Sequence, residues 1–262
     1  MTFGLTGYAL AALASAVAGA INALAGGGTL LTFPVLTALG LSSVSANVTN
    51  TVALLPGYLG GAWAQRSVLA RSEQRSRLLR LVPASLAGGL AGAFLLGLGG
   101  EGAFRAIVPY LILLASALLA VGDRVKALVA SRSKDPTESG EGRLGAGSLA
   151  AIVAASVYGG YFGAGVSVIL LAVLGIALDD SLSDINALKQ AIALSCNAAA
   201  AVVFAAGGMV DWPVAAVMAL SALGGGVLGG ALADRMKAPV LRALVVSLGL
   251  VVGLYFLFFK RA

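Results

Sequence analysis

Uncharged runs long enough to cross a membrane dominate the chain. A membrane-spanning helix needs about 20 apolar residues, because the hydrocarbon core is about 30 Å thick and a helix rises about 1.5 Å per residue. The runs without a charged residue are 1–65, 81–100, 106–122, 144–178, 190–210, 212–233 and 243–259. Charged residues concentrate between them, chiefly in 66–80 and 123–143. The pattern predicts an all-α, polytopic integral membrane protein.

The two halves of the chain resemble each other. When residue 86 is placed on residue 223, the glycine-rich residues 86–93 coincide with residues 223–230. The same register, which we call the repeat alignment, also matches two pairs of glycines, Gly26 with Gly163 and Gly28 with Gly165. We therefore predict three parts: a first transmembrane repeat (1–122), a polar cytoplasmic linker (123–143) and a second transmembrane repeat (144–262).

Each repeat is expected to hold five helical pieces, one of which is too short to span. In the first repeat these pieces are roughly 5–25, 29–41, 46–65, 80–98 and 104–121. The second piece covers only about 20 Å, and the glycines at 26–28 break the helix before it. A re-entrant hairpin followed by three spanning helices explains this pattern, and an odd number of crossings inverts the second repeat. The distribution of Lys and Arg favours inverted over parallel repeats by too little to decide.

Composition excludes several classes of site. The chain has no His and one Cys, and it is 59% hydrophobic and 11% charged. Zinc and haem sites, His-based catalysis and a disulfide framework therefore lack their residues, so we expect no metal and no cofactor. The net charge of +6 is better explained by basic residues that flank apolar helices on the cytoplasmic side than by nucleic-acid binding.

The glycine breaks are the first candidate for chemistry. A short helix that begins at Thr29, after three glycines, exposes backbone N–H groups at the positive end of its dipole, and this favours an anion. The second-repeat counterpart, Gly163-Ala164-Gly165-Val166-Ser167, would point at the same midplane from the opposite side. The alternative is that small residues here only let helices pack closely.

Polar side chains inside apolar helices are the second candidate. Asn47, Thr49 and Asn50 interrupt one apolar run, and Lys189 and Gln190 lie in its counterpart. Amides and hydroxyls donate hydrogen bonds to oxyanions without a fixed charge, although such side chains also hold helices together. Lys189 either neutralises a bound anion within the membrane or extends to the interface near Asp184, and the sequence leaves both alternatives open.

The chain also resembles a known family. Residues 18–36 (AGAINALAGGGTLLTFPVL), Gly40-Leu41 and residues 46–50 (ANVTN) are similar to the N-terminal motif of the sulfite exporter TauE/SafE family, also described as toluene sulfonate uptake permeases. The resemblance extends over the whole chain through the repeat. It implies a polytopic inner-membrane transporter of sulfite, sulfonates or related small anions. Residues that match the motif are Gly26, Gly27, Gly28, Pro34, Thr49 and Asn50. The second repeat departs from it, with Ala164 among the glycines and no proline before the next turn.

Together these features predict a secondary transporter, expected to be an exporter, in the cytoplasmic (inner) membrane. A small anion would be held between opposed helix ends near the midplane, and rocking of one repeat against the other would give alternating access. The candidate substrate-binding residues are Gly26, Gly27, Gly28, Thr29, Asn47, Thr49, Asn50, Gly163, Ala164, Gly165, Ser167, Lys189 and Gln190.

Three other classes of function stay open at this point. An anion channel and a membrane assembly or scaffold protein both fit the composition. An intramembrane enzyme would need Lys189 paired with Ser195 or Ser167, and we expect no catalytic residue. The expected partners are a small anionic substrate and the lipid bilayer, without nucleic acid, and a homo-oligomer remains an open alternative.

Overall fold

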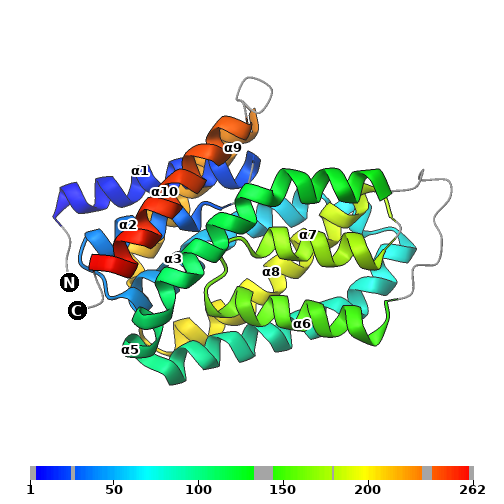
Figure 1. The fold of residues 1–262 in the computed structure, drawn as a ribbon, viewed down its shortest axis with the longest axis horizontal. Coiled ribbons are helices and arrows are strands. Elements are labelled where there is room, and N and C mark those ends of the chain that lie inside the picture. The colour runs from blue at the N-terminus through cyan, green and yellow to red at the C-terminus, as the bar shows by residue number, and fades with distance from the viewer. Residues whose placement is uncertain (1–3, 25–26, 133–143, 179, 232–237, 260–262) are drawn as a thin grey trace.

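The described part of the chain is built from helices and contains no strand. The structure is a computed structural model that describes residues 4–24, 27–132, 144–178, 180–231 and 238–259. Its helices (Figure 1) are α1 (Leu5–Leu24), α2 (Thr29–Ala38), α3 (Ser43–Ala64), α4 (Arg66–Leu69), α5 (Ser72–Arg132), α6 (Ala146–Tyr161), α7 (Val166–Ala177), α8 (Leu182–Ala206), α9 (Trp212–Ala231) and α10 (Ala238–Phe259). The predicted all-α class is confirmed, and α1, α5 and α8 are long and apolar enough to cross a membrane.

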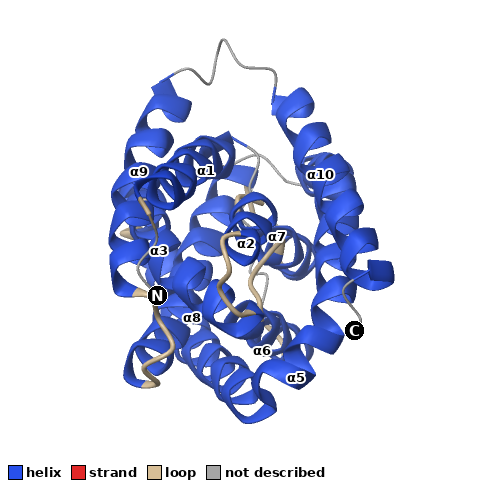
Figure 2. Ribbon diagram, turned by 90° about the vertical axis from the view of Figure 1, so that its left-hand side faces the viewer, coloured by secondary structure: helices blue, strands red, loops and turns tan. Residues whose placement is uncertain are grey.

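Two short helices occupy the centre of the molecule. Figure 2 shows α2 and α7 in the middle of the projection, with longer helices around them. They have 10 and 12 residues, so at about 1.5 Å per residue neither is long enough to span a membrane. Each follows a break after a longer helix, α1 or α6. The breaks fall where the glycine-rich segments of the sequence lie.

Helix α5 contains two of the predicted helical pieces. It runs for 61 residues, and Gly100 interrupts it with φ 64 and ψ −171. A positive φ of this kind is readily adopted only by glycine, so Gly100 separates an earlier part of α5 from a later one. Both parts extend beyond the predicted pieces, because the charged residues 72–80 and 123–132 are also helical.

Helices α3 and α8 run antiparallel, and hydrogen bonds and an ion pair near their ends define the two ends of the molecule. At one end, Ser45 Oγ donates to the carbonyl oxygen of Met209 over 3.0 Å. We call this the Glu101 end, because the Glu101 carboxylate accepts hydrogen bonds from the first N–H groups of α3. At the other end, the Arg71 guanidinium lies 2.9 Å from an Asp184 carboxylate oxygen. We call this the Arg77 end; it holds α4, the start of α5 and the loop between α7 and α8.

The first helix of each half packs against a helix of the other half. Helix α1 packs chiefly against α9, and α6 packs against α5. A Cβ on Gly225 would overlap the backbone of Ala16, and a Cβ on Gly88 would lie 2.7 Å from the carbonyl oxygen of Val153. The two contacts are equivalent, because the repeat alignment places Gly88 on Gly225 and Ala16 on Val153. Small residues therefore serve close helix packing at both places.

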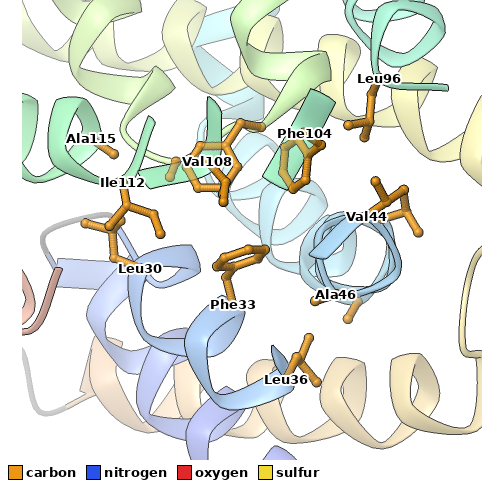
Figure 3. Packing of buried hydrophobic residues seen from close by; sticks show 14 of the residues in the cluster. Leu30, Phe33, Leu36, Val44, Ala46, Leu96, Phe104, Val108, Ile112 and Ala115 are labelled. Atoms are coloured by element: carbon orange, nitrogen blue, oxygen red, sulfur yellow. The ribbon is translucent and has the colours of Figure 1, made fainter. Parts of the chain in front are cut away.

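A buried aromatic cluster joins the two central breaks. Phe33 in α2 is fully buried and lies edge-on to Phe104 of α5, with ring centroids 6.3 Å apart (Figure 3). The Phe33 ring is also edge-on to Phe162, which directly follows α6, at 5.7 Å. Aromatic pairs at such distances add stabilisation beyond the area that they bury. The cluster therefore fixes α2 beside the junction of α6 and α7.

Candidate substrate site

The two helix breaks meet at one small cavity. Its free volume is about 10 Å³, and its lining comes from the start of α2, from α3, from the junction of α6 and α7, and from α8. The lining residues are Thr29, Asn50, Thr51, Leu54, Tyr58, Phe162, Gly163 and Asn197. A volume of about 10–15 Å³ holds one water molecule, so the cavity is nearly closed in this conformation. Among the residues that the structure describes, no Lys, Arg, Asp or Glu lines it.

Asn50 anchors the polar side of the cavity. Its Oδ1 accepts a hydrogen bond of 2.6 Å from Thr32 Oγ1, and its Nδ2 donates one of 3.2 Å to Thr29 Oγ1. The buried Asn50 amide is therefore held in one orientation by two hydroxyls of α2. A hydroxyl that accepts a hydrogen bond can still donate its own proton. Thr29 is thus placed to donate towards a molecule in the cavity.

Asn197 and Thr51 complete the polar lining from two other positions. Asn197 lies in α8, where its Nδ2 donates to the Ala193 carbonyl oxygen over 2.8 Å. Thr51 lies in α3 and donates to the carbonyl oxygen of Asn47 over 3.0 Å. Thr51 ends the polar run 46–51 of the sequence, although it is not among the candidate residues, and Asn197 was not predicted. In the sequence, Asn197 is one of two side-chain amides in the apolar run 190–210, the other being Gln190.

The helix starts offer fewer exposed amides than predicted. The Gly28 N–H already donates to Asn22 Oδ1 over 2.7 Å. The N–H of Leu30 donates to the Gly27 carbonyl oxygen over 2.9 Å, and the N–H of Val166 donates to that of Gly163 over 3.2 Å. Part of each first turn is therefore closed by local partners, as is common at helix ends. Fewer backbone N–H groups are therefore free to bind an anion than predicted, and side-chain donors become the more important candidates.

The glycines themselves are required by backbone conformation. Gly27, Gly163 and Gly165 have φ values of 93, 80 and 76. Residues with a Cβ adopt such values only at a cost in backbone strain. Gly165 directly precedes α7, whereas Gly28 has φ −53 and caps α2 in an ordinary helical conformation. Gly26 lies outside the described residues. The predicted breaks are thus real turns, and the alternative of close packing also applies, since Gly27 lies against Leu119.

Three further predicted residues make structural hydrogen bonds outside the cavity lining. Asn47 Nδ2 donates to the Tyr161 carbonyl oxygen, the last of α6, over 2.9 Å. Thr49 Oγ1 accepts from the N–H of Asp211, directly before α9, over 3.0 Å. The Ala164 carbonyl oxygen accepts from the Tyr158 hydroxyl over 2.6 Å. For these polar groups the observed contacts are those of the structural alternative.

The predicted residues of α8 also lie outside the lining. Lys189 Nζ donates to Asn186 Oδ1, one turn earlier, over 2.7 Å. Gln190 packs against Gly61 of α3, where a Cβ would lie 2.8 Å from Gln190 Nε2. Neither belongs to the cavity, and nor does the half-buried Ser167.

The Ser-Lys pair of an intramembrane enzyme finds no support in the contacts of its members. The Ser195 hydroxyl donates to the Ala191 carbonyl oxygen over 2.8 Å, while the Lys189 ammonium donates to Asn186. Within the described ranges, no group of His, Cys, Asp or Glu residues has the arrangement of a metal site. The polar chemistry of the cavity is therefore that of uncharged hydrogen-bond donors and acceptors.

Comparison with known proteins gives one match. A family model described as sulfite exporter TauE/SafE matches residues 11–256. No curated protein and no solved structure matches the chain. Because the family match covers nearly all of both halves, including every residue that lines the cavity, the chain belongs to the sulfite exporter TauE/SafE family of membrane transporters.

Proposed function

We propose that the protein is a secondary transporter that exports sulfite or a related small sulfur-containing or organic anion. The observation that carries the proposal is the single cavity shared by both helix breaks, lined by Thr29, Asn50, Gly163 and Asn197. An oxyanion has several acceptor oxygens, and hydroxyl and amide groups supply donors to them. No described carboxylate lines the cavity to repel an anion.

The cavity also has an apolar side. Leu54, Tyr58 and Phe162 face the space that the polar groups share. Small-molecule sites combine apolar walls with a few placed polar groups that fix the ligand's orientation. The mixed lining supports both an inorganic oxyanion and one with a small organic substituent, and the nearly closed cavity must widen before either can bind.

We infer that the two halves, 1–122 and 144–262, form inverted repeats that move against each other. Three observations support this. The helices α3 and α8, which match in the repeat, run antiparallel. The packing of α1 on α9 has its counterpart in the packing of α6 on α5. Gly249 of α10 packs on Ser116 of α5, and the repeat alignment converts this contact into that of Gly253 with Ile112. Inverted repeats with a shared central site are typical of alternating access.

We place the Arg77 end in the cytoplasm and the protein in the inner membrane. Basic residues near this end are Arg66, Arg71, Arg75, Arg77, Arg80, Arg124, Lys126 and Arg132, whereas Arg105 lies near the Glu101 end. Excess Lys and Arg marks the cytoplasmic side. With the cell interior negative, outward movement of an anion is favoured by roughly 2.3 kcal/mol per charge per 100 mV. Export therefore needs no coupling ion.

Counterflow in proteoliposomes tests the proposed function. Vesicles preloaded with sulfite, thiosulfate, a sulfonate or a carboxylate are diluted into a trace of the labelled anion. A transporter accumulates label transiently and saturably, with sulfite or a sulfonate as the best preload. Accumulation with none of these anions would overturn the proposal in favour of a scaffold. Flux that grows linearly with concentration would overturn it in favour of a channel.

A further inference from the structure

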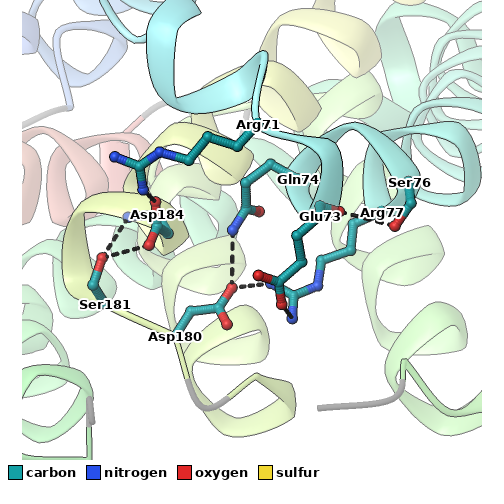
Figure 4. Close-up of polar contacts among 8 residues, drawn as sticks. All are labelled: Arg71, Glu73, Gln74, Ser76, Arg77, Asp180, Ser181 and Asp184. Carbon is teal, nitrogen blue, oxygen red and sulfur yellow. Dashed lines mark hydrogen bonds and ion pairs between the residues drawn. The ribbon is translucent and has the colours of Figure 1, made fainter. Parts of the chain in front are cut away.

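The Arg77 end is closed by a cluster of charged and amide side chains (Figure 4). The Arg77 guanidinium pairs with the Asp180 carboxylate and, over 2.7 Å, with Glu73. Gln74 Nε2 donates to Asp180 over 3.3 Å. These contacts join the first turns of α5 to the loop between α7 and α8, so they bridge the two halves of the chain.

The central pair is buried, which is unusual for charged side chains at a helix end. The Arg77 and Asp180 side chains are 8% and 3% exposed. A buried ion pair loses much of its attraction to desolvation and is often no more stable than an apolar contact of the same volume. Stability alone therefore does not explain why an ion pair stands here.

The matching position in the other half is apolar. The repeat alignment places Arg77 on Val214, which is fully buried at the start of α9. Asp180 directly precedes the capping residue of α8, Ser181, as Leu41 directly precedes that of α3, Ser42. Leu41 and Val214 belong to one hydrophobic cluster. The two ends are thus closed by different chemistry.

We propose that the Arg77–Asp180 pair is the inner gate of the transport pathway, a role that rests on the proposed function. The loop that carries Asp180 connects α7, which follows the break at Gly163, with α8, which carries Asn197. Both Gly163 and Asn197 line the cavity. Separation of this loop from the start of α5 opens the cavity towards the Arg77 end.

An ion pair suits a contact that must open into water. When the pair separates, both ions regain their hydration, so the open state recovers the desolvation penalty. An apolar contact of the same area would expose its surface to water at a cost that grows with that area. The ion pair therefore keeps the closed and open states close in free energy at this end.

Thiol labelling of a cysteine between the gate and the cavity tests this role. The reporter is Gln190→Cys in a Cys196→Ala background, because α8 runs from Asp184 through residue 190 to Asn197. A membrane-impermeant maleimide is applied to inside-out vesicles. Asp180→Asn should raise the labelling rate about tenfold, equivalent to a shift of about 1.4 kcal/mol. Unchanged labelling in a monodisperse, counterflow-active variant overturns the gate.

Two further variants keep the test decisive. The double variant Arg77→Met with Asp180→Leu replaces the pair by an apolar contact, and it should fold while slowing counterflow about tenfold. Wild-type counterflow in this variant also overturns the gate, even when Asp180→Asn fails to fold. The matched control is Arg71→Gln, which removes the 60% exposed partner of the neighbouring pair and should leave labelling unchanged. A wild-type protein without counterflow sinks the proposed function instead, whatever the labelling shows.

Discussion

At the scale of single residues, polar side chains in the apolar interior perform two different tasks. Asn47 and Thr49 each bond to a backbone group at the end of another helix. Asn50, three residues after Asn47, instead holds the hydroxyl of Thr29 at the cavity. Backbone groups at helix ends need such partners when they are buried. Neighbouring polar residues on one helix therefore have different roles, and their replacement should affect stability in some cases and substrate binding in others.

Replacement of Asn50 by Asp should weaken substrate binding more than replacement by Ala. The carboxylate would still accept from Thr32, but it would place a negative charge where Nδ2 now donates to Thr29. Like charges repel most strongly where water is excluded. We expect the affinity for sulfite, measured by isothermal titration, to fall at least about tenfold, or about 1.4 kcal/mol. Equal affinity in Asn50→Asp and wild type would contradict the site, and Ser167→Ala is the control outside the cavity.

Removal of the Lys189 ammonium should leave substrate affinity within about twofold of wild type, a change below about 0.5 kcal/mol. Lys189 bonds to Asn186 and does not line the cavity, so Lys189→Ala removes a charge that the bound anion does not contact. The same titration checks this. A loss of tenfold or more would show that Lys189 reaches the substrate and that the cavity occupant lies nearer to the start of α8.

The sequence predicted part of the candidate site, for identifiable reasons. Thr29 and Gly163 were selected because glycine runs mark helix breaks, and Asn50 because it belongs to a cluster of polar residues. Asn197 and the aromatic Tyr58 line the same cavity, but neither belongs to a run of polar residues that would mark it. Only packing of α3 against α8 brings them together. The hydrogen bond from the Gly28 N–H to Asn22 Oδ1 could not be predicted, because it depends on the geometry of the turn between α1 and α2.

At the scale of helices, the starts of the two short helices tolerate a side chain differently. Gly27 and Gly165 both have positive φ. A Cβ at position 27 would overlap the Leu119 side chain, whereas one at position 165 would lie 3.4 Å from the Ala115 Cα. The first break is therefore constrained by backbone and packing, and the second mainly by backbone.

Gly27→Ala should accordingly lower the thermal stability more than Gly165→Ala. Backbone strain of about 1–2 kcal/mol applies to both, and the overlap with Leu119 adds to the first alone. The melting temperature of the detergent-solubilised protein, followed by tryptophan fluorescence, checks the order. Gly27→Ala should lower the melting temperature less when Leu119 has already been replaced by Ala, because the overlapping side chain is then absent. The opposite order of stability would show that the packing at Leu119 readily adapts.

The start of α3 illustrates why helix boundaries were predicted less well than helix positions. The expected start at residue 46 lies three residues after the observed start at Ser43. Ser42 caps the helix locally, accepting from Ser45 N–H over 3.2 Å. The Glu101 carboxylate accepts from the N–H groups of Ser43 and Val44 over 2.7 and 2.8 Å. The second partner comes from α5, and no local pattern announces it.

Loss of the Glu101 carboxylate should destabilise the start of α3. Caps of this kind contribute about 0.5–2 kcal/mol, and a negative charge adds favourable interaction with the helix dipole. Glu101→Ala should therefore lower the melting temperature, and Glu101→Gln, which keeps one acceptor, should lower it less. Asp123→Asn, at an exposed residue of α5, controls for the loss of one negative charge. Identical melting temperatures for all three variants and wild type would contradict the cap.

At the scale of the whole molecule, α3 and α8, which we propose to be equivalent helices of inverted repeats, run antiparallel. Arg75 and Trp212 are related by the repeat alignment, and both are exposed near the starts of α5 and α9. Arg75 lies at the Arg77 end, close to the Arg71–Asp184 pair. Trp212 lies at the Glu101 end. It directly follows Asp211, whose N–H donates a hydrogen bond to Thr49 Oγ1. The proposed inversion therefore predicts that the two positions face opposite compartments.

Cysteines at these two positions should therefore react from opposite sides of the membrane. In a Cys196→Ser background, an impermeant maleimide added to intact cells should label Trp212→Cys but not Arg75→Cys, and inside-out vesicles should give the reverse. The excess of basic residues near the Arg77 end favours Arg75 on the inside, and the proposed inversion then predicts Trp212 on the outside. Labelling of both cysteines from one side would require parallel repeats. If the two cysteines react from opposite sides but Arg75→Cys reacts from outside, the repeats are inverted and only the orientation in the membrane is reversed. This pair of cysteines therefore tests the inversion and the orientation separately.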